Sequence, residues 1–275
     1  MQKVVLVGAG GKMGCRITDN LKDSEHVMSY LEVSPEGIAK LKEKGISVSE
    51  PDNVLPDADA VILAVPDVVI KKVAADLVPR ARSGARILTL DPAAPHAGHL
   101  PERQDVAYFV THPCHPSIFN WEADEKDHRD YFGGYTAKQS IVCALMQGND
   151  ADYTACENLA RQMYAPVRRA HCITVQQMAL LEPALAETMA ATLFSVLREG
   201  MDKVVELGVP REAARDFILG HMNIELAVLF NEIPGVFSDA CNKAIARAKP
   251  IIFRDNWSDI FKPDDVQQQI RDITT

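Results

Sequence analysis

The segment His112-Pro113-Cys114-His115-Pro116 contains two imidazoles three residues apart, each followed by a proline within the segment. Imidazole gains and loses a proton near neutral pH, and the prolines restrict the backbone around it. The segment directly follows a predicted buried strand at residues 107–111. We therefore predict that His112 and His115 act in proton transfer or substrate binding. Two other interpretations stay open: a zinc site that includes Cys114 but has no clear fourth ligand, and a rigid loop with exposed histidines.

Two acidic residues interrupt an otherwise apolar helical stretch. Glu182 and Glu187 lie within Leu-Leu-Glu-Pro-Ala-Leu-Ala-Glu at residues 180–187. A carboxylate is costly to bury unless it is paired or used in chemistry. The two residues fall on different faces of a helix, so we expect only one of them to be functional. Pro183 should kink the helix, and we predict Glu182, beside that kink, as the catalytic residue.

A second polar pair lies on the following helical stretch. His221 and Glu225 are four residues apart and therefore share one helix face, among apolar neighbours. We predict contact with the substrate for this pair, and the alternative is that it only stabilises the helix.

The amino-terminal residues show the pattern of a dinucleotide-binding loop. An apolar strand at residues 3–7 leads into Gly8-Ala9-Gly10-Gly11-Lys12-Met13-Gly14 and then into a helix. Glycines allow a sharp turn and a close approach to a pyrophosphate, whose charge the helix N-terminus favours. The predicted cofactor-binding residues are Gly8, Gly10, Gly11, Lys12, Met13 and Gly14, with Val65 and Pro66 at the end of a later strand.

A carboxylate ends the second predicted strand. Glu32 lies 18 positions after Gly14. An acid near that distance accepts hydrogen bonds from the adenosine ribose hydroxyls and repels the 2′-phosphate of NADP. Glu32 therefore favours NAD as the cofactor, and the alternative is an ordinary solvated glutamate.

These residues need a sheet that brings the ends of several strands together. The continuous apolar run at residues 60–65 is typical of a parallel strand buried on both faces, and further strands are predicted at residues 86–90 and 107–111. With helices between them, they predict an α/β fold with an N-terminal Rossmann doubly wound sheet, which binds ligands at the carboxyl ends of its strands. We also expect a short edge strand near residues 46–49.

The pattern becomes entirely helical after residue 173. We predict two domains, a Rossmann dinucleotide-binding domain at residues 1–173 and an all-helical substrate and dimerisation domain at residues 174–275. The later helices are apolar around most of their circumference, which is typical of helices buried in a bundle or a dimer. We therefore expect a homodimer.

Composition limits the class of partner. The 275 residues carry a net charge of −9, so nucleic-acid binding is not expected. No segment approaches 18 uninterrupted apolar residues, so no membrane span is expected. The six cysteines form no C-x-x-C pair, and the chain opens without a leader pattern, which together favour a cytoplasmic protein with reduced thiols.

With these features placed, the chain resembles the 6-phosphogluconate and β-hydroxyacid dehydrogenase superfamily over nearly its whole length. The turn Gly-Lys-Met-Gly at residues 11–14 is similar to the turn used there, whereas the superfamily's usual catalytic lysine has no counterpart in a G-x-x-x-K context. A closer resemblance is to the D-apionate oxidoisomerases. It rests on Val-Gly-Ala-Gly-Gly-Lys-Met-Gly at 7–14, Thr-His-Pro-Cys-His-Pro-Ser at 111–117, and the Glu182-Pro183 and Gly220-His221 helices.

This resemblance implies an NAD-dependent oxidoreductase that acts on a branched sugar acid and converts D-apionate to 3-oxo-isoapionate. Oxidation of the 2-hydroxyl places a ketone beside a tertiary alcohol, and that arrangement permits an α-ketol shift of a hydroxymethyl group. The shift needs a deprotonated tertiary hydroxyl and a polarised ketone oxygen. A divalent metal such as Mg²⁺ commonly polarises the oxygen, and Glu182 or Glu225 could hold one, although the sequence shows no metal site.

Two other functions remain open from the sequence. One is a simple NAD-dependent hydroxy-acid dehydrogenase that performs no rearrangement. The other is a non-catalytic NAD-binding sensor, against which the paired histidines and acids argue, because a sensor does not need them.

Overall fold

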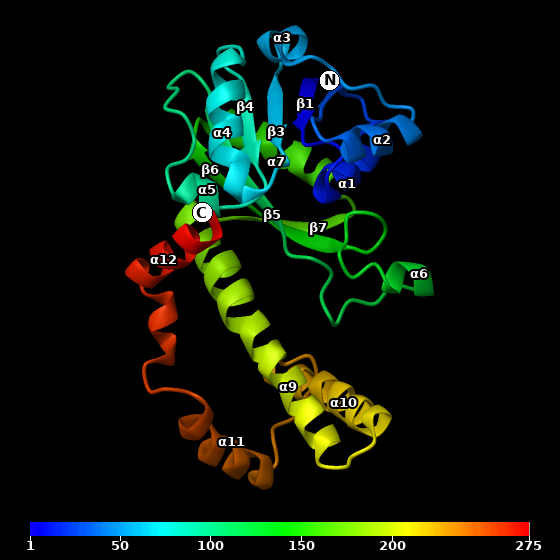
Figure 1. Cartoon of the computed structure of the whole chain (residues 1–275), viewed down its shortest axis with the longest axis vertical. Helices are drawn as coiled ribbons and strands as arrows, with labels where there is room; N and C mark the ends of the chain where they lie inside the picture. The colour runs from blue at the N-terminus through cyan, green and yellow to red at the C-terminus, as the bar shows by residue number, and fades with distance from the viewer. Residues whose placement is uncertain (275) are drawn as a thin grey trace. The chain divides into compact units, whose positions relative to one another are not determined.

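The structure, a computed structural model, describes residues 1–274 and contains a seven-stranded sheet (Figure 1). The strand order is β2-β1-β3-β4-β5-β6-β7, and neighbouring strands are parallel except for β5 and β6. The strands are β1 (Lys3–Val7), β2 (Val27–Leu31), β3 (Ala60–Leu63), β4 (Arg86–Thr89), β5 (Ala107–Pro113), β6 (Gln139–Gln147) and β7 (Val167–Cys172). The predicted Rossmann sheet is confirmed.

Helices cover both faces of this sheet. The helices up to residue 163 are α1 (Lys12–Leu21), α2 (Pro35–Glu43), α3 (Pro51–Val54), α4 (Asp67–Leu77), α5 (Ala93–His96), α6 (Glu125–His128) and α7 (Asp150–Met163), with 3₁₀ turns η1 (Leu55–Asp57) and η2 (Val78–Arg80), and α1 and α7 cover one face of the sheet while α4 covers the other. The predicted edge strand at residues 46–49 is wrong. Ile46 and Val48 pack against the core, and Ser49 donates one backbone hydrogen bond of 2.8 Å to Tyr30, but no strand forms.

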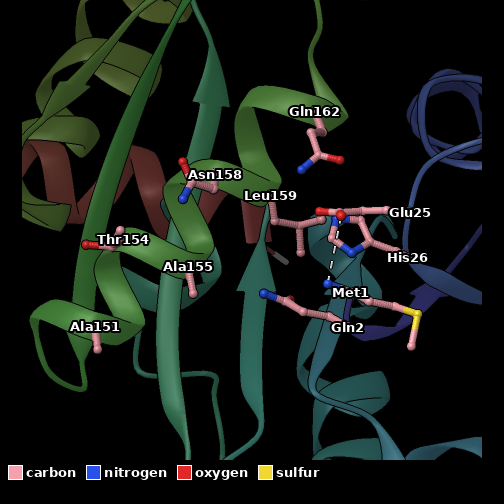
Figure 2. A pocket seen from close by; sticks show the side chains of 10 residues that line it. All are labelled: Met1, Gln2, Glu25, His26, Ala151, Thr154, Ala155, Asn158, Leu159 and Gln162. Carbon is pink, nitrogen blue, oxygen red and sulfur yellow. Dashed lines mark ion pairs between the residues drawn. The ribbon is translucent and has the colours of Figure 1, made fainter.

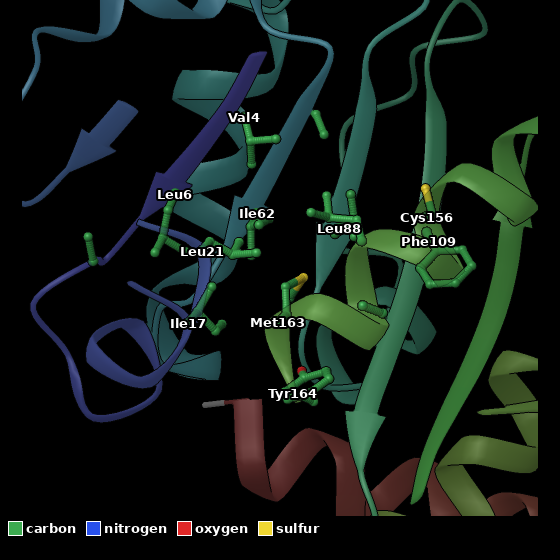
Figure 3. Close-up of a cluster of buried hydrophobic side chains, with 14 of the residues drawn as sticks. Val4, Leu6, Ile17, Leu21, Ile62, Leu88, Phe109, Cys156, Met163 and Tyr164 are labelled. Carbon is green, nitrogen blue, oxygen red and sulfur yellow. The ribbon is translucent and has the colours of Figure 1, made fainter. Parts of the chain in front are cut away.

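Successive side chains of the central strands point to opposite faces and build two core layers. One layer lies between the sheet and helices α1 and α7 (Figure 3), and it includes Val4, Leu6, Ile17, Leu21, Ile62, Leu88, Phe109, Leu159 and Met163. The other layer lies against α4 and includes Val5, Val7, Val61, Leu63, Ile70, Ala74 and Leu77. Because β1 and β3 are buried on both faces, the carboxyl edge where ligands should bind is held rigidly.

The chain divides into two compact units, and the division differs from the predicted boundary near residue 174. The first unit comprises Met1–Glu182 together with the C-terminal residues from Gln267 onward, and the second comprises Pro183–Val266. The helical elements after the sheet are α8 (Val175–Ala179), η3 (Leu180–Ala191), α9 (Thr192–Glu206), α10 (Arg211–Leu229), α11 (Asp239–Ile252), η4 (Trp257–Phe261) and α12 (Pro263–Thr274). Helix α8 and the end of α12 therefore belong with the Rossmann unit.

The helical run that crosses the boundary has two unusual properties. The stretch Leu180–Ala191 is π-helical around Pro183, which has no N–H to donate, so the predicted disturbance at this proline takes the form of wider turns. The run Val175–Glu206 is also long and apolar enough to cross a membrane by length and composition, with only 11% of its most apolar window buried. An apolar surface this exposed is typical of a helix that contacts a partner.

Candidate active site

The dinucleotide loop has the geometry that its glycines predict. Gly8 has φ +74°, and a Cβ there would lie 2.4 Å from the Ala64 carbonyl oxygen of the strand beside it. A Cβ on Gly14 would lie 2.0 Å from the Gly8 carbonyl oxygen, so α1 can pack on the loop only through glycine. The loop therefore lies directly against the end of β3, and the side chain of Val65 also borders Gly8.

The first turn of α1 is open to an anionic ligand. Its N-cap is Gly11, no side chain caps the helix, and no acidic residue lies in the first turn. The first amide N–H groups, from Lys12 and Met13 onward, have no intrahelical acceptor and can bind a pyrophosphate. This arrangement fits the two phosphates of NAD. Pro66, also predicted to contact the cofactor, is exposed and directly precedes α4.

Glu32 connects the end of β2 to the glycine loop. Its Oε2 accepts a 2.8 Å hydrogen bond from the Gly10 N–H, and its Oε1 accepts from the amides of Val33 and Ser34 at 2.9 Å each. Burial opposes ionisation, but these amide hydrogen bonds outweigh it and lower the pKa of Glu32. An ionised carboxylate has about four acceptor positions, so Oε2 retains one for a ribose hydroxyl.

Gly37 is a member of this site that the sequence reasoning missed. A Cβ on it would lie 2.6 Å from the Glu32 side chain, and a Cβ on Gly10 would lie 2.3 Å from the Gly37 backbone. The loop, the carboxylate and the start of α2 therefore pack without room for larger residues. The only signal available in the sequence was the glycine that ends the segment Ser34-Pro35-Glu36-Gly37.

At the carboxyl edge of the sheet, His112 lies between two carboxylates. Its Nδ1 is 2.7 Å from the Leu90 carbonyl oxygen, which can only accept, so Nδ1 carries a proton. Its Nε2 is 3.3 Å from Oε2 of Glu182, and Nδ1 is 3.8 Å from Oδ2 of Asp91. All three side chains are partly buried, with 18 to 24% exposed. The structure thus brings together the predicted pair His112 and Glu182.

Helix α8 explains how Glu182 reaches β5. Thr174 and Gln177 form the predicted capping box, which fixes the start of the helix. Val175 and Met178 are buried against Val110 and the neighbouring strand β6, so the helix crosses the sheet at this edge. Glu182 follows one turn later, whereas Glu187 belongs to the second unit and is exposed. Of the two glutamates, Glu182 is therefore the one that lies at the sheet edge.

The charges of this cluster depend on one another. Burial disfavours a charged imidazole, but the hydrogen bond to Glu182 and the charges of Glu182 and Asp91 outweigh it and raise the pKa of His112 to about 9. Burial would raise the pKa of Glu182, yet its hydrogen bond with His112 and the charge of that imidazolium lower it. At neutral pH the pair is therefore an imidazolium beside a carboxylate.

Two further carboxylates lie at the same edge and were not among the predicted site residues. Burial raises the pKa of Asp91, whose Oδ1 accepts a 2.8 Å hydrogen bond from the Ala93 N–H. Burial and the charge of Asp91 raise the pKa of Asp67 to about 6. The signal available in the sequence was their position, since each adjoins a proline directly after a buried strand.

His115 is held in an uncommon backbone conformation. Its φ is +60°, a region that non-glycine residues enter at a cost of roughly 1–3 kcal/mol. Its Nδ1 is 2.8 Å from the Phe132 carbonyl oxygen, and its ring centroid is 6.3 Å from that of His112. The two predicted histidines therefore lie side by side at the sheet edge.

The predicted substrate pair is placed in the second unit. His221 is exposed, its Nδ1 is 2.8 Å from the Phe217 carbonyl oxygen, and its ring stacks on Phe217 with centroids 4.0 Å apart. Glu225 is also exposed on the same helix. These contacts within α10 leave the role of the pair in substrate binding as a prediction.

Asp91, His112 and Glu182 also form a donor set that could hold a metal ion, with ligand atoms within 4.8 Å of one another. Both His112 nitrogens already have partners, Leu90 and Glu182, so a cation would have to displace the proton on Nε2. Glu225, the other carboxylate considered for a metal, is not in this set. The same three side chains, an imidazole between two carboxylates, can also exchange protons.

A separate pocket lies at the opposite end of the sheet. It is lined by residues before β1 and β2 and by α7 (Figure 2): Met1, Gln2, Glu25, His26, Ala151, Thr154, Ala155, Asn158, Leu159 and Gln162. Parallel α/β sheets bind cofactors at the carboxyl ends of their strands, whereas this pocket is at the amino ends of β1 and β2. It is therefore not the reaction site.

A glycine loop on a Rossmann sheet, with an acid–imidazole pair at its carboxyl edge, defines a dinucleotide-dependent oxidoreductase. Two family models match the chain: phosphogluconate dehydrogenase (decarboxylating) C-term over residues 120–274, and NADP oxidoreductase coenzyme F420-dependent over residues 3–94. Both support the superfamily resemblance seen in the sequence.

The chain belongs to the D-apionate oxidoisomerase family. It is 54% identical over 274 residues to the D-apionate oxidoisomerase of Cupriavidus necator, covering 99% of both chains, and 51% identical to that of Rhizobium rhizogenes over the full length of both. A solved structure, a semialdehyde dehydrogenase NAD-binding protein from Cupriavidus necator in complex with calcium and NAD, is also similar. It shares 54% identity, full coverage of both chains and a TM-score of 0.98.

Proposed function

We propose that this protein is an NAD-dependent oxidoisomerase that converts D-apionate to 3-oxo-isoapionate. The observation that carries the proposal is the contact between His112 and Glu182 beside a loop shaped for NAD, because the reaction needs both a proton donor and a proton acceptor. The relatives named D-apionate oxidoisomerase, at 54% and 51% identity over nearly the full chain, support the choice of substrate.

The cofactor part of the proposal rests on three features of the chain. Bound NAD would accept the hydride from the carbon that bears the 2-hydroxyl. The amides at the start of α1 would bind its pyrophosphate, and Glu32 would accept a hydrogen bond from its adenosine ribose. The similar Cupriavidus necator structure, solved in complex with calcium and NAD, supports NAD as the cofactor.

In the oxidation step, a base must take the proton of the 2-hydroxyl. His115 is suited to this, because the Phe132 carbonyl oxygen keeps a proton on Nδ1 and leaves the lone pair of the neutral ring on Nε2. The proton that His115 accepts then leaves to solvent. This step accounts for the one proton released overall.

In the rearrangement, the tertiary hydroxyl must lose a proton while the ketone oxygen gains one. Glu182, ionised at neutral pH, would accept the first proton, and the His112 imidazolium would donate the second. The 3.3 Å contact between Glu182 Oε2 and His112 Nε2 then allows the proton to return from one to the other. The pair thus ends the step in its starting state, and no proton is gained or lost.

The function is tested by incubating the protein with NAD and D-apionate, following NADH absorbance and identifying the product skeleton by carbon NMR. Rearranged 3-oxo-isoapionate supports the proposal. An unrearranged 2-keto acid would instead identify a simple hydroxy-acid dehydrogenase, and NAD binding with no NADH formed would identify a sensor. The assay is repeated with a chelator, and loss of the rearrangement alone would transfer the polarising role from His112 to a cation such as Mg²⁺.

We also propose that the protein is a cytoplasmic homodimer that binds neither nucleic acid nor membranes. Large apolar side chains on α9, on α10 and in the turn after α10 are exposed, including Phe194, Phe217 and Phe230. An obligate dimer interface resembles a domain core cut in half, and a second copy would cover this surface. The six cysteines are free thiols, which supports a reducing compartment.

A further inference from the structure

The segment between β5 and β6 returns to the dinucleotide loop through Phe132. The Lys12 ammonium lies 4.2 Å from the centroid of the Phe132 ring, and the Arg16 guanidinium carbon lies 4.4 Å from it. Cations within about 6 Å of an aromatic face are attracted to it. Lys12 and Arg16 belong to the first turns of α1, so the Phe132 ring packs on the helix that follows the glycine loop.

The same residue contacts His115 through both its backbone and its ring. The Phe132 carbonyl oxygen accepts a 2.8 Å hydrogen bond from His115 Nδ1, and the two ring centroids are 4.7 Å apart with planes tilted by 56°. The carbonyl selects the tautomer in which Nε2 holds the lone pair, and the ring limits rotation of the imidazole. Phe132 therefore determines both the protonation pattern and the direction of His115.

The backbone around Phe132 is itself anchored to α1. Arg16 donates a hydrogen bond to the Gly133 carbonyl oxygen and lies 3.8 Å from the Asp130 carboxylate, with both charged side chains largely buried. Asn20 donates a 2.9 Å hydrogen bond to the Gly134 carbonyl oxygen. The carbonyl that holds His115 is thus placed by contacts with α1.

We propose that Phe132 is a positioning residue that joins the dinucleotide-binding helix to His115 and holds the imidazole with Nε2 available as a base. The proposal rests on the role given to His115 in the proposed function. The segment between β5 and β6 would thus help to orient the imidazole of His115, in addition to connecting two strands.

The test compares Phe132→Leu, Phe132→Tyr and Tyr135→Leu in the full-length protein. Tyr135 is the matched control, because its ring also lies 4.4 Å from Arg16, while the ring contact with His115 belongs to Phe132. We expect Phe132→Leu to lower kcat by roughly 10- to 100-fold through misplacement of the base, with the Kd for NAD changed less than threefold. Phe132→Tyr keeps an aromatic ring and should retain most of the parental kcat, and the kcat of Tyr135→Leu should be close to that of the parent.

A double-mutant cycle separates positioning from general damage. In a His115→Gln background, Phe132→Leu should cause little further loss of kcat, because the residue through which it acts is already gone. Multiplicative losses from the two changes would overturn the proposal. So would equal losses in Phe132→Leu and Tyr135→Leu.

A measurement without substrate keeps this inference distinct from the proposed function. The ring nitrogen shifts of His115 in NMR report which nitrogen carries the proton, and we expect protonation at Nδ1 in the neutral parent. Phe132→Leu removes the ring but keeps the backbone carbonyl, so we expect the same tautomer with a more mobile imidazole, seen as broadened ring signals. If the parent does not turn over D-apionate, the proposed function fails while this result still stands. A parent ring protonated at Nε2 would overturn the inference directly.

Discussion

At the scale of single residues, the site works through a charge pair that the protein holds in a fixed state. His112 has its proton shared with Glu182, and its other nitrogen is committed to the Leu90 carbonyl oxygen. An imidazolium with a pKa near 9 is a poor base at neutral pH but a ready acid. In the proposed function, His112 therefore donates a proton, and Glu182 and His115 accept protons.

Replacing the acceptor should therefore stop the rearrangement. In Glu182→Gln the shape is kept but the carboxylate is lost, and we expect turnover to fall by roughly 10²- to 10⁴-fold. NAD affinity should stay near the parental value, because the glycine loop is not involved. Turnover and a fluorescence titration with NAD measure the two effects, and Glu187→Gln is the control from the same helical run. Near-parental turnover in Glu182→Gln would show that another group accepts the proton.

The same pair makes stability depend on pH in a defined direction. The pKa of His112 is about 9 in the folded protein against a usual value of 6.5, so the folded state holds this proton more tightly. The stabilisation is fully present below pH about 6.5 and is lost as pH rises through about 9. We expect the thermal midpoint to fall across this window in the parent and to fall less in Glu182→Gln. A parent whose midpoint rises over this range would contradict the ion pair.

Glu32 should decide between the two nicotinamide cofactors. In Glu32→Ala the carboxylate that repels a 2′-phosphate is gone, so we expect the ratio of kcat/KM for NAD over NADP to fall by at least about tenfold. The variant also loses the hydrogen bond to the Gly10 amide, and some loss of NAD affinity should accompany the change. Glu36→Ala, on the exposed start of α2, is the control. An unchanged ratio would exclude contact between Glu32 and the ribose.

At the scale of elements, the last helix supports the edge of the sheet that carries the site. Gln267 in α12 lies 3.0 Å from Nδ1 of His96 in α5, the short helix that directly follows Asp91 and Pro92. Ile270, one turn later, is fully buried. The end of the chain thus belongs to the Rossmann unit and packs near the strand end that supplies one of the site's carboxylates.

Shortening the buried side chain should weaken the fold and not only the helix. We expect Ile270→Ala to destabilise the protein by about 2–5 kcal/mol, as for other buried large-to-small changes. Gln268→Ala, exposed on the same helix, should change stability little. Chemical denaturation of both variants gives the comparison, and equal stabilities would show that α12 is not part of the Rossmann core.

At the scale of the whole molecule, the exposed apolar side chains of the second unit predict the assembly. Phe194, Phe217 and Phe230 are 53%, 67% and 66% exposed, which is unusual for so many large aromatics on one pair of helices and the turn after them. Burial of such a surface against a second copy would stabilise a dimer at about 25 cal/mol per Å² of apolar area.

Light scattering should therefore give the mass of a dimer at micromolar concentration. The double change Phe194→Glu and Phe217→Glu should shift the protein toward a monomer or make it aggregate, because charges replace the apolar surface. Val33→Glu, which changes an equally apolar residue that is 93% exposed on the Rossmann unit, should leave the dimer intact. A monodisperse monomer of the parent would refute the assembly.

The sequence alone determined the Rossmann sheet, the dinucleotide loop and the region of the site. These features are encoded by residues that are close in the sequence. Buried parallel strands are continuous apolar runs, and a tight turn at a pyrophosphate needs several glycines near one another. His112 and His115 were predicted near the cofactor because they directly follow one such strand, and the carboxyl ends of parallel strands share one edge.

The tertiary structure decided what depends on contacts between distant residues. The pairing of His112 with Glu182, the nearby Asp67 and Asp91, the seating of Phe132 on Lys12 and Arg16, and the return of α12 to the first unit join segments separated by tens of residues or more. No local periodicity encodes such pairs, because each results from how the helices pack on the sheet. The sequence favoured Glu182 over Glu187 only from the neighbouring proline, and the packing of α8 on β5 and β6 places Glu182 beside the imidazole.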